Sequence, residues 1–260
     1  IEDLSPHLAC YGVDNIITPN LDQLASEGVR YDIAWATAPV CAVNRTSILT
    51  GLYSTCTGAH HMRNRILYPS EIKTYPELMR QAGYYCTNPT KTDYQFSSPD
   101  KEVIWDDASD SAHYRNRPDN KQPFFHVINF ATTHQSRHTG DPGAYDPGTL
   151  TLPPYYPDTE KVRLQWASYF NNITRVDQQI GEVLAELQNE GAAENTIVFF
   201  YSDHGAGLPR AKWWAYDAGL REPFIVRIPE QFRVDGQGKP ASATNELISN
   251  LDHNLPFSLG

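Results

Sequence analysis

The chain has 260 residues, a formal net charge of −10 at pH 7, 40% hydrophobic residues and 12% aromatic residues. This composition excludes an intrinsically disordered protein, and the length suffices for one substantial α/β domain or two small ones. The acidic balance argues against nucleic acid as a partner, because an extended nucleic-acid interface needs clustered cations. No run of apolar residues is long enough to span a membrane.

Helices and strands alternate along the chain, which predicts an α/β fold: a central, mostly parallel sheet with helices on both faces. In chain order the pattern indicates a helix over 18–25, a strand over 29–35, a helix over 41–50, a short helix over 75–82, strands over 84–87 and 124–130, a helix over about 159–189, and strands over 196–201 and 223–228. Apolar residues recur every three or four positions through the longest helix. The segment 135–157 shows no periodicity and is predicted to be an ordered loop near a site.

Four polar clusters come just after predicted strands, at Cys41, Lys91, His134 and 203–204 (Asp-His). In an open parallel sheet, ligands bind in the crevice beyond the carboxyl ends of the strands. We therefore expect these clusters to converge at one edge of the sheet, although they lie far apart in the sequence.

The cysteines are too few and too irregularly spaced for a disulfide framework or a zinc site. We expect Cys10, Cys56 and Cys86 to be free thiols. Cys41 differs, because it stands at the predicted start of a helix with Arg45 one turn further on. Unpaired N–H groups and the partial positive charge of a helix N-terminus suit a nucleophile that meets an anionic substrate.

A carboxylate and an imidazole stand side by side at the end of the predicted strand 196–201. Asp203 and His204 could supply two ligands to one metal ion from this position. The alternative is a plain strand-end turn, because Asp and Gly favour turns in any context.

The segment around Cys41 resembles a signature of the sulfatase family. In that signature a cysteine is followed by x-Pro-x-Arg and then by Thr-Gly. Cys41, Arg45 and 50–51 (Thr-Gly) match it, whereas Val43 and Asn44 stand where the family usually has Pro and Ser.

A second stretch resembles the other long sulfatase signature. It contains 203–205 (Asp-His-Gly), Lys212 and 219–223 (Gly-Leu-Arg-Glu-Pro) in the family's order. By this resemblance Asp203 and His204 are metal ligands and Lys212 contacts the sulfate.

Three shorter elements fit the same family. Glu2 and Asp3 resemble its metal-binding acidic pair, with Glu2 in place of the more usual Asp. Lys91 matches the lysine of a Lys-x-His element in which Asp93 replaces the histidine. His134 matches the family's histidine near the leaving group, where a proton donor is chemically sensible because an alkoxide leaves poorly unprotonated.

Taken together, the motifs resemble those of type I, formylglycine-dependent sulfatases of the alkaline-phosphatase-like superfamily. The catalytic residues implied are Cys41, Arg45, Lys91, His134 and Lys212. The metal ligands implied are Glu2, Asp3, Asp203, His204 and the modified side chain of Cys41. The ion expected is Ca2+, because acidic oxygen ligands suit a hard cation.

The resemblance also implies a reaction and its partners. Cys41 would be oxidised to formylglycine by a formylglycine-generating enzyme, and one hydroxyl of the hydrate would attack the sulfur of a sulfated small molecule or carbohydrate. Val43 lacks the fixed backbone angle of proline, so we expect this conversion to be inefficient. The family generally acts outside the cytoplasm or in lysosomes.

Residues 1–260 are expected to form a sulfatase catalytic domain that is incomplete at both ends, with a smaller C-terminal subdomain normally beginning near 252–254. Two alternatives stay open. One is a phosphate or phosphonate ester hydrolase of the same superfamily. The other is a degenerate, non-catalytic relative, an alternative that the departures from the signature at Val43 and Asn44 favour.

Overall fold

The computed structural model describes residues 1–98 and 101–252, so residues 253–254, near the expected start of the C-terminal subdomain, lie outside it. The helices are α1 (Pro19–Glu27), α2 (Cys41–Thr50), α3 (Ser54–Thr57), α4 (Tyr75–Gln81), α5 (Lys101–Ile104), α6 (Glu160–Asn189) and α7 (Asp217–Leu220). The strands are β1 (Val29–Trp35), β2 (Ile66–Leu67), β3 (Tyr85–Thr87), β4 (Phe96–Ser98), β5 (Phe124–His126), β6 (Val198–Tyr201), β7 (Arg221–Arg227), β8 (Ser242–Thr244) and β9 (Ile248–Ser249).

The central sheet has the strand order β6-β7-β1-β8, and β9 also pairs with β1. The α/β prediction is confirmed, and β8 and β9 are parallel to β1 as expected. β7, however, is antiparallel to both β1 and β6. The reason is the connection: the chain from β6 to β7 loops back at the same end of the sheet instead of crossing over it on a helix.

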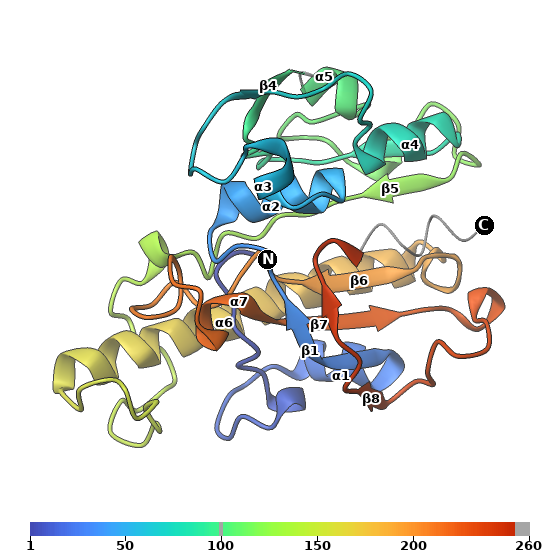
Figure 1. Ribbon diagram of the computed structural model, residues 1–260. Helices are drawn as coiled ribbons and strands as arrows, with labels where there is room; N and C mark the ends of the chain where they lie inside the picture. Colours follow the sequence, from blue (N-terminus) through green and yellow to red (C-terminus); the bar gives the residue numbers. More distant parts are fainter. Residues whose placement is uncertain (99–100, 253–260) are drawn as a thin grey trace.

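Two further parallel pairs, β2–β4 and β3–β5, lie with α2 to α5 above the central sheet in Figure 1. β5 is shorter than the strand expected over 124–130, because its ladder ends where its partner β3 ends, at Thr87. A cavity of about 940 Å³ opens between β5 and β6, lined mainly by apolar side chains of these strands and of α6. Among the described strands, β5 therefore pairs only with β3, and β6 only with β7.

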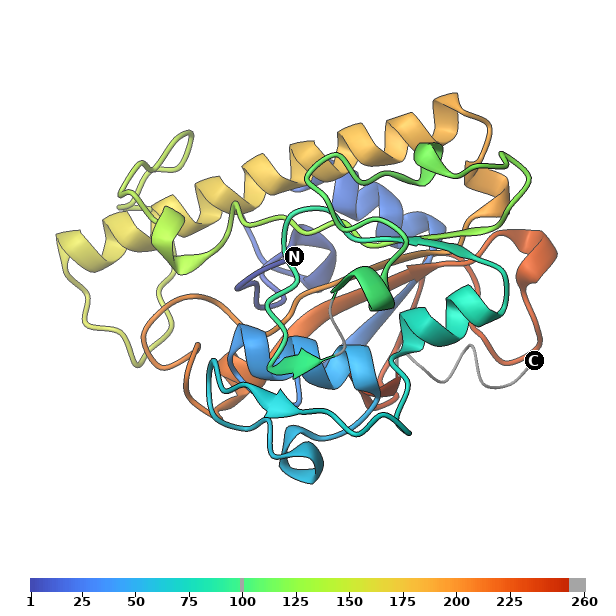
Figure 2. The ribbon, with the colours of Figure 1, turned by 90° about the horizontal axis from the view of Figure 1, so that it is seen from above.

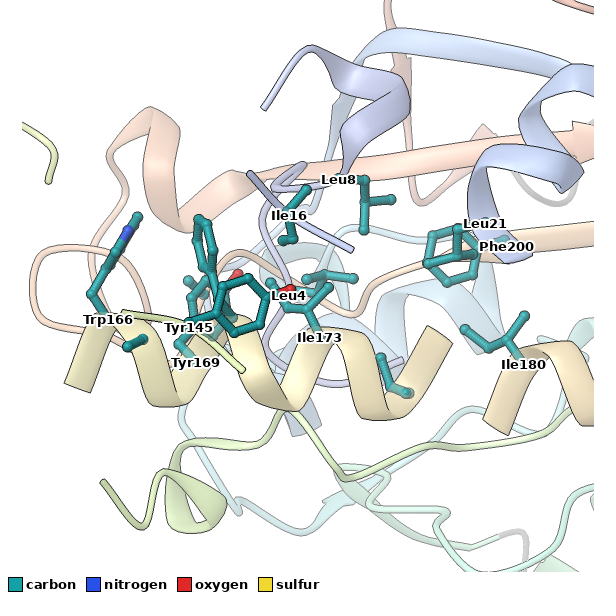
Figure 3. Packing of buried hydrophobic residues seen from close by; sticks show 14 of the residues in the cluster. Leu4, Leu8, Ile16, Leu21, Tyr145, Trp166, Tyr169, Ile173, Ile180 and Phe200 are labelled. Atoms are coloured by element: carbon teal, nitrogen blue, oxygen red, sulfur yellow. The ribbon is translucent and has the colours of Figure 1, made fainter. Parts of the chain in front are cut away.

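Helix α6 carries the largest part of the core and runs the length of the molecule in Figure 2. It begins where Thr159 Oγ1 accepts a hydrogen bond from Val162 N, which satisfies a free donor of the first turn. Figure 3 shows its inward face, with Trp166, Tyr169, Ile173 and Ile180, packed on side chains that precede β1 and on β6. Each such buried side chain stabilises the fold by about 1.5–3 kcal/mol.

The N-terminal residues bridge the two sides of the cavity. The Ile1 ammonium donates to the Tyr201 carbonyl oxygen at 2.9 Å, and Glu2 N donates to the Phe130 carbonyl oxygen at 3.1 Å. Asp203 N in turn donates to the Ile1 carbonyl oxygen at 2.9 Å. Burial lowers the pKa of the Ile1 ammonium to about 6, so a charge at this point is disfavoured.

A segment fused before Ile1 should therefore fill the cavity. We expect an extension of about six apolar, β-branched residues to raise Tm by about 5 °C or more, because it adds strand pairing. Calorimetry of the extended and original chains measures this. An extension of equal length made of Gly and Pro is the control, and an equal rise with both extensions would contradict the expectation.

Candidate active site

Three segments meet at one end of the central sheet. β1 and β6 end there, β7 begins there, and Trp35 of β1 lies opposite Arg221 of β7. Cys41 opens α2 shortly after β1, and Asp203 with His204 follows β6 directly. Two of the four clusters expected at the carboxyl edge of the sheet, Cys41 and 203–204, thus lie at this end of the central sheet.

Cys41, Asp203 and His204 form the centre of this site. One Cys41 sulfur, one Asp203 carboxylate oxygen and one His204 ring nitrogen lie within 4.8 Å of one another. All three residues are buried. Cys41 is the first residue of α2, so the free N–H groups of that helix face the same region.

Asp3 joins the centre through charged neighbours. Lys212 Nζ donates to both Asp3 carboxylate oxygens at 2.9 Å, and His204 Nε2 lies 3.1 Å from Asp3 Oδ1. Gln135 N donates to Asp3 Oδ2 at 2.8 Å, and Asp3 N donates to Asp203 Oδ1 at 3.1 Å. Asp3 has a φ of 54°, a left-handed conformation that costs a non-glycine residue free energy and is common at functional sites.

The charges in this centre shift the pKa values of its residues. Burial raises the pKa of Asp3 and Asp203, but the stronger combined effect of His204 with Lys212 or Arg45 lowers both. Burial opposes the charged form of His204, yet Asp203 and Asp3 raise its pKa to about 10. The centre is therefore a set of buried, mutually stabilised charges.

The donor set fits a cation. His204 Nδ1 lies 2.8 Å from the Gly205 carbonyl oxygen, whereas the buried Nε2 has no well-aligned hydrogen-bond acceptor. This arrangement leaves Nε2 directed toward the carboxylates, so a cation bound there would take the place of the Nε2 proton, as in ligating histidines whose other nitrogen is held by a carbonyl group. Only glycine fits at 205, because a Cβ there would lie 2.0 Å from the Ala218 carbonyl oxygen.

Arg45 lies one turn after Cys41 on α2 and is largely buried. Its Nε donates to Asp203 Oδ2 at 3.3 Å and its Nη1 donates to Asn129 Oδ1 at 2.7 Å. Burial opposes its charge, but Asp203 and Glu2 raise the pKa of the guanidinium above its ordinary value. Asn129 was not among the predicted site residues, because a single amide in a strand continuation carries no sequence signal.

Asn44 has a structural role that the sequence did not reveal. Its Oδ1 accepts hydrogen bonds from Thr37 N at 2.8 Å and from Thr37 Oγ1 at 2.7 Å. Its Nδ2 donates to the Asp203 carbonyl oxygen. This fully buried amide connects α2 to the segment after β1 and to the loop at Asp203, so its polar atoms are satisfied as those of buried polar groups generally are. Val43, the other departure from the signature, packs against Val40 and Met62.

A second cluster lies beside the first. Ligand atoms of Glu2, Asp3 and His134 lie within 4.8 Å of one another. Lys91 Nζ forms an ion pair with Glu2 and lies 3.6 Å from Asp93 Oδ2. His134 Nε2 lies 3.9 Å from Glu2 Oε2, and burial lowers the pKa of His134. Glu2 thus contacts Lys91 and lies close to His134, and its role as a metal ligand stays a prediction.

A family model described as Sulfatase matches residues 1–254. The chain belongs to the sulfatase family. An ulvan-active sulfatase from Formosa agariphila is 37% identical over 96% of this chain and 49% of its own length. The human N-sulphoglucosamine sulphohydrolase is 27% identical over 87% of this chain and 53% of its own length. This sulfatase chain spans about half the length of these curated relatives.

Solved structures of low sequence identity share the fold. A phosphonate monoester hydrolase from Silicibacter pomeroyi has a TM-score of 0.76 at 18% identity, covering 97% of this chain and 70% of that one. A protein in complex with its substrate D-glucosamine-2-N,6-O-disulfate has a TM-score of 0.69 at 20% identity, covering 97% and 73%. The sulfatase chain thus has the expected alkaline-phosphatase-like fold. Within residues 1–98 and 101–252, no helix has the length and apolar character needed to cross a membrane.

Proposed function

We propose that this chain forms the catalytic domain of a sulfuric ester hydrolase, which cleaves a sulfate ester to an alcohol and inorganic sulfate. The observation that carries the proposal is the gathering of Cys41, Asp203 and His204 within 4.8 Å at the carboxyl edge of the sheet. Membership of the sulfatase family supports it. The relatives named above suggest a sulfated carbohydrate as the substrate.

Cys41 is the proposed site of oxidation to formylglycine by a formylglycine-generating enzyme. With that modification, Cys41 would provide the hydroxyl that attacks the sulfur as the alcohol leaves, and the second hydroxyl needed for sulfate to be released and the aldehyde restored. The position of Cys41 at the start of α2 favours a bound anion, because the helix N-terminus carries a partial positive charge.

Asp3, Asp203 and His204, together with the modified side chain of Cys41 and with Glu2, would hold Ca2+. The ion would neutralise part of the charge on the sulfuryl oxygens. Arg45, Lys91 and Lys212 would bind the same oxygens, which matters most when negative charge shifts toward the leaving oxygen. His134 or Lys212 would transfer a proton to the departing alcohol.

A paired assay tests this function against its rival. The likeness of fold to a phosphonate monoester hydrolase favours phosphate or phosphonate ester hydrolysis as the second candidate. We expect kcat/KM for 4-nitrophenyl sulfate to exceed that for 4-nitrophenyl phosphate and for 4-nitrophenyl phenylphosphonate at least tenfold, or about 1.4 kcal/mol. The reverse order would support the rival. Hydrolysis of none of the three esters by aldehyde-bearing protein would support a degenerate relative.

Calcium should stabilise the folded chain. At a concentration of about 100 times Kd, a ligand that binds only the folded state adds about 2.7 kcal/mol, or about 5–10 °C in Tm. We expect this shift with CaCl2 for the original chain and its loss in Asp203→Asn. Asp235→Asn, on an exposed carboxylate, is the matched control and should keep the shift. A shift of equal size in Asp203→Asn would place the ion elsewhere.

A further inference from the structure

The loop that follows the metal-site residues carries an exposed cluster of aromatic side chains. Trp213, Trp214 and Tyr216 are 54%, 57% and 48% exposed, and Tyr155 is 41% exposed. We call these four side chains, with Arg210 between Tyr155 and Tyr216, the aromatic platform. Large apolar groups gathered at the surface mark binding sites more often than those scattered singly.

Arg210 is held inside this platform. Its guanidinium carbon lies 4.6 Å from the ring centroid of Tyr155 and 4.6 Å from that of Tyr216. Tyr216 is stacked against Trp214, with ring centroids 6.4 Å apart and planes inclined by 21°. Among the described residues, no carboxylate forms an ion pair with Arg210, so the rings orient its charge, while the charge of Asp217 acts on Tyr155 nearby.

The backbone fixes the platform in place. Arg210 and Trp213 have φ values of 66° and 77°, a left-handed conformation that costs such residues about 1–2 kcal/mol each. Trp214 N donates to the Ala211 carbonyl oxygen at 3.0 Å, and Tyr156 Oη donates to the Pro209 carbonyl oxygen at 2.6 Å. A Cβ on Gly219 would lie 2.2 Å from the Trp214 carbonyl oxygen, so only glycine allows this close packing.

The platform adjoins the candidate active site. Lys212 is buried with its Nζ on Asp3, while its neighbour Trp213 is turned to the surface. Trp213 N donates to the Pro39 carbonyl oxygen at 2.8 Å, two residues before Cys41. One short loop thus holds both a cation of the reaction centre and the exposed rings.

We propose that the aromatic platform binds a sugar ring of an acidic, sulfated saccharide next to the ring whose ester is cleaved. This inference rests on the proposed function, because only that function makes the residues beside the platform a reaction centre. Indole and phenol faces stack on the C–H face of a pyranose ring and leave its hydroxyls in water. Arg210 binds a sulfate or carboxylate on that sugar, since a guanidinium matches either group with two parallel hydrogen bonds. In a chain of net charge −10, such a cation without an acidic partner favours an anionic ligand.

Calorimetric binding tests the proposal without requiring turnover. The probes are acidic tetrasaccharides prepared from heparin, chondroitin sulfate and ulvan, with neutral maltotetraose for comparison. We expect at least one acidic tetrasaccharide to bind, and its Kd to rise at least about tenfold in the double variant Trp213→Ala, Trp214→Ala. Arg210→Ala should weaken the acidic probe similarly while leaving the affinity for the neutral one unchanged. Phe232→Ala is the control, since this exposed ring lies beyond the other end of β7.

Turnover of 4-nitrophenyl sulfate separates this proposal from the proposed function, because this ester contains no sugar that the platform could bind. Variants with weaker saccharide binding and unchanged KM for the aryl ester support the platform. Weaker saccharide binding in a chain that cleaves no sulfate ester supports the platform and contradicts the proposed function. The proposal is overturned if no acidic probe binds or if the variants bind as the original chain does. It is also overturned if the double variant loses only a self-association of the protein.

Discussion

Replacing Cys41 with alanine is expected to lower turnover of a sulfate ester by at least about four orders of magnitude, or about 5.5 kcal/mol of transition-state stabilisation. The reason is that Cys41 alone, among the described cysteines, lies with Asp203 and His204. Alanine at this position leaves α2 intact but carries no oxygen that attacks sulfur. Steady-state assays with 4-nitrophenyl sulfate measure the effect.

Cys56→Ala is the matched control for this prediction. Cys56 is an exposed free thiol on α3, so its removal should change neither kcat nor Tm appreciably. If Cys41→Ala kept more than about one tenth of the original activity, another group would have to attack the ester. A tenfold loss in rate corresponds to only about 1.4 kcal/mol of transition-state stabilisation, which is too little for the loss of the nucleophile.

Replacing Lys212 with alanine is expected to destabilise the fold by about 3 kcal/mol and to reduce turnover sharply. The ammonium donates to both oxygens of Asp3, and both side chains are buried. Removal of one partner from such a pair leaves a buried charge without compensation. Because His204 also contacts Asp3, we expect the loss of stability to lie at the lower end of the range of about 3–5 kcal/mol that is usual when one partner of a buried pair is removed. Chemical denaturation and kcat measurements check the two parts.

Two further variants make this test specific. Lys161→Ala, on an exposed position of α6, should change neither stability nor turnover. Lys212→Ala combined with Asp3→Asn should cost less stability than the sum of the two single changes, because the pair is lost only once. Additive effects would mean that the two side chains are not coupled in solution.

Local signals in the sequence predicted local structure well. α2 begins at Cys41 and ends before Gly51, and α6 covers Glu160–Asn189, close to the helices expected over 41–50 and about 159–189. The position of the site at the carboxyl edge of the sheet was also predicted, because the polar clusters directly follow predicted strands. These features depend on neighbours within about one helical turn or on a general property of α/β sheets.

The sequence predicted that distant clusters would meet, but it predicted neither the direction of β7 nor the individual hydrogen bonds between distant segments. The direction of β7 depends on how the chain returns from β6, and no residue pattern encodes that path. The bonds of Asn44 to Thr37 and to the loop at Asp203 likewise appear only when the chain is folded. From the sequence, Asn44 was therefore only a departure from a signature, whereas in the structure it holds α2 against Thr37 and the loop at Asp203.

The exposure of the aromatic platform also lay beyond the sequence. Trp213 and Trp214 could equally have filled a core, since large apolar residues usually do. Arg210 and Trp213 are left-handed, a conformation that non-glycine residues do not suggest from the sequence, and the rings of Trp213 and Trp214 are exposed beside a buried Lys212.

Mass spectrometry of the peptide that carries Cys41 tests the central claim most directly. The chain is produced with and without a formylglycine-generating enzyme, and the fraction in which the side chain has changed from –CH2SH to –CHO is compared with turnover of 4-nitrophenyl sulfate. We predict partial conversion, because Val43 replaces the usual proline, and a rate proportional to the aldehyde fraction. Equal sulfate-ester hydrolysis by protein in which Cys41 is entirely a thiol would contradict the account.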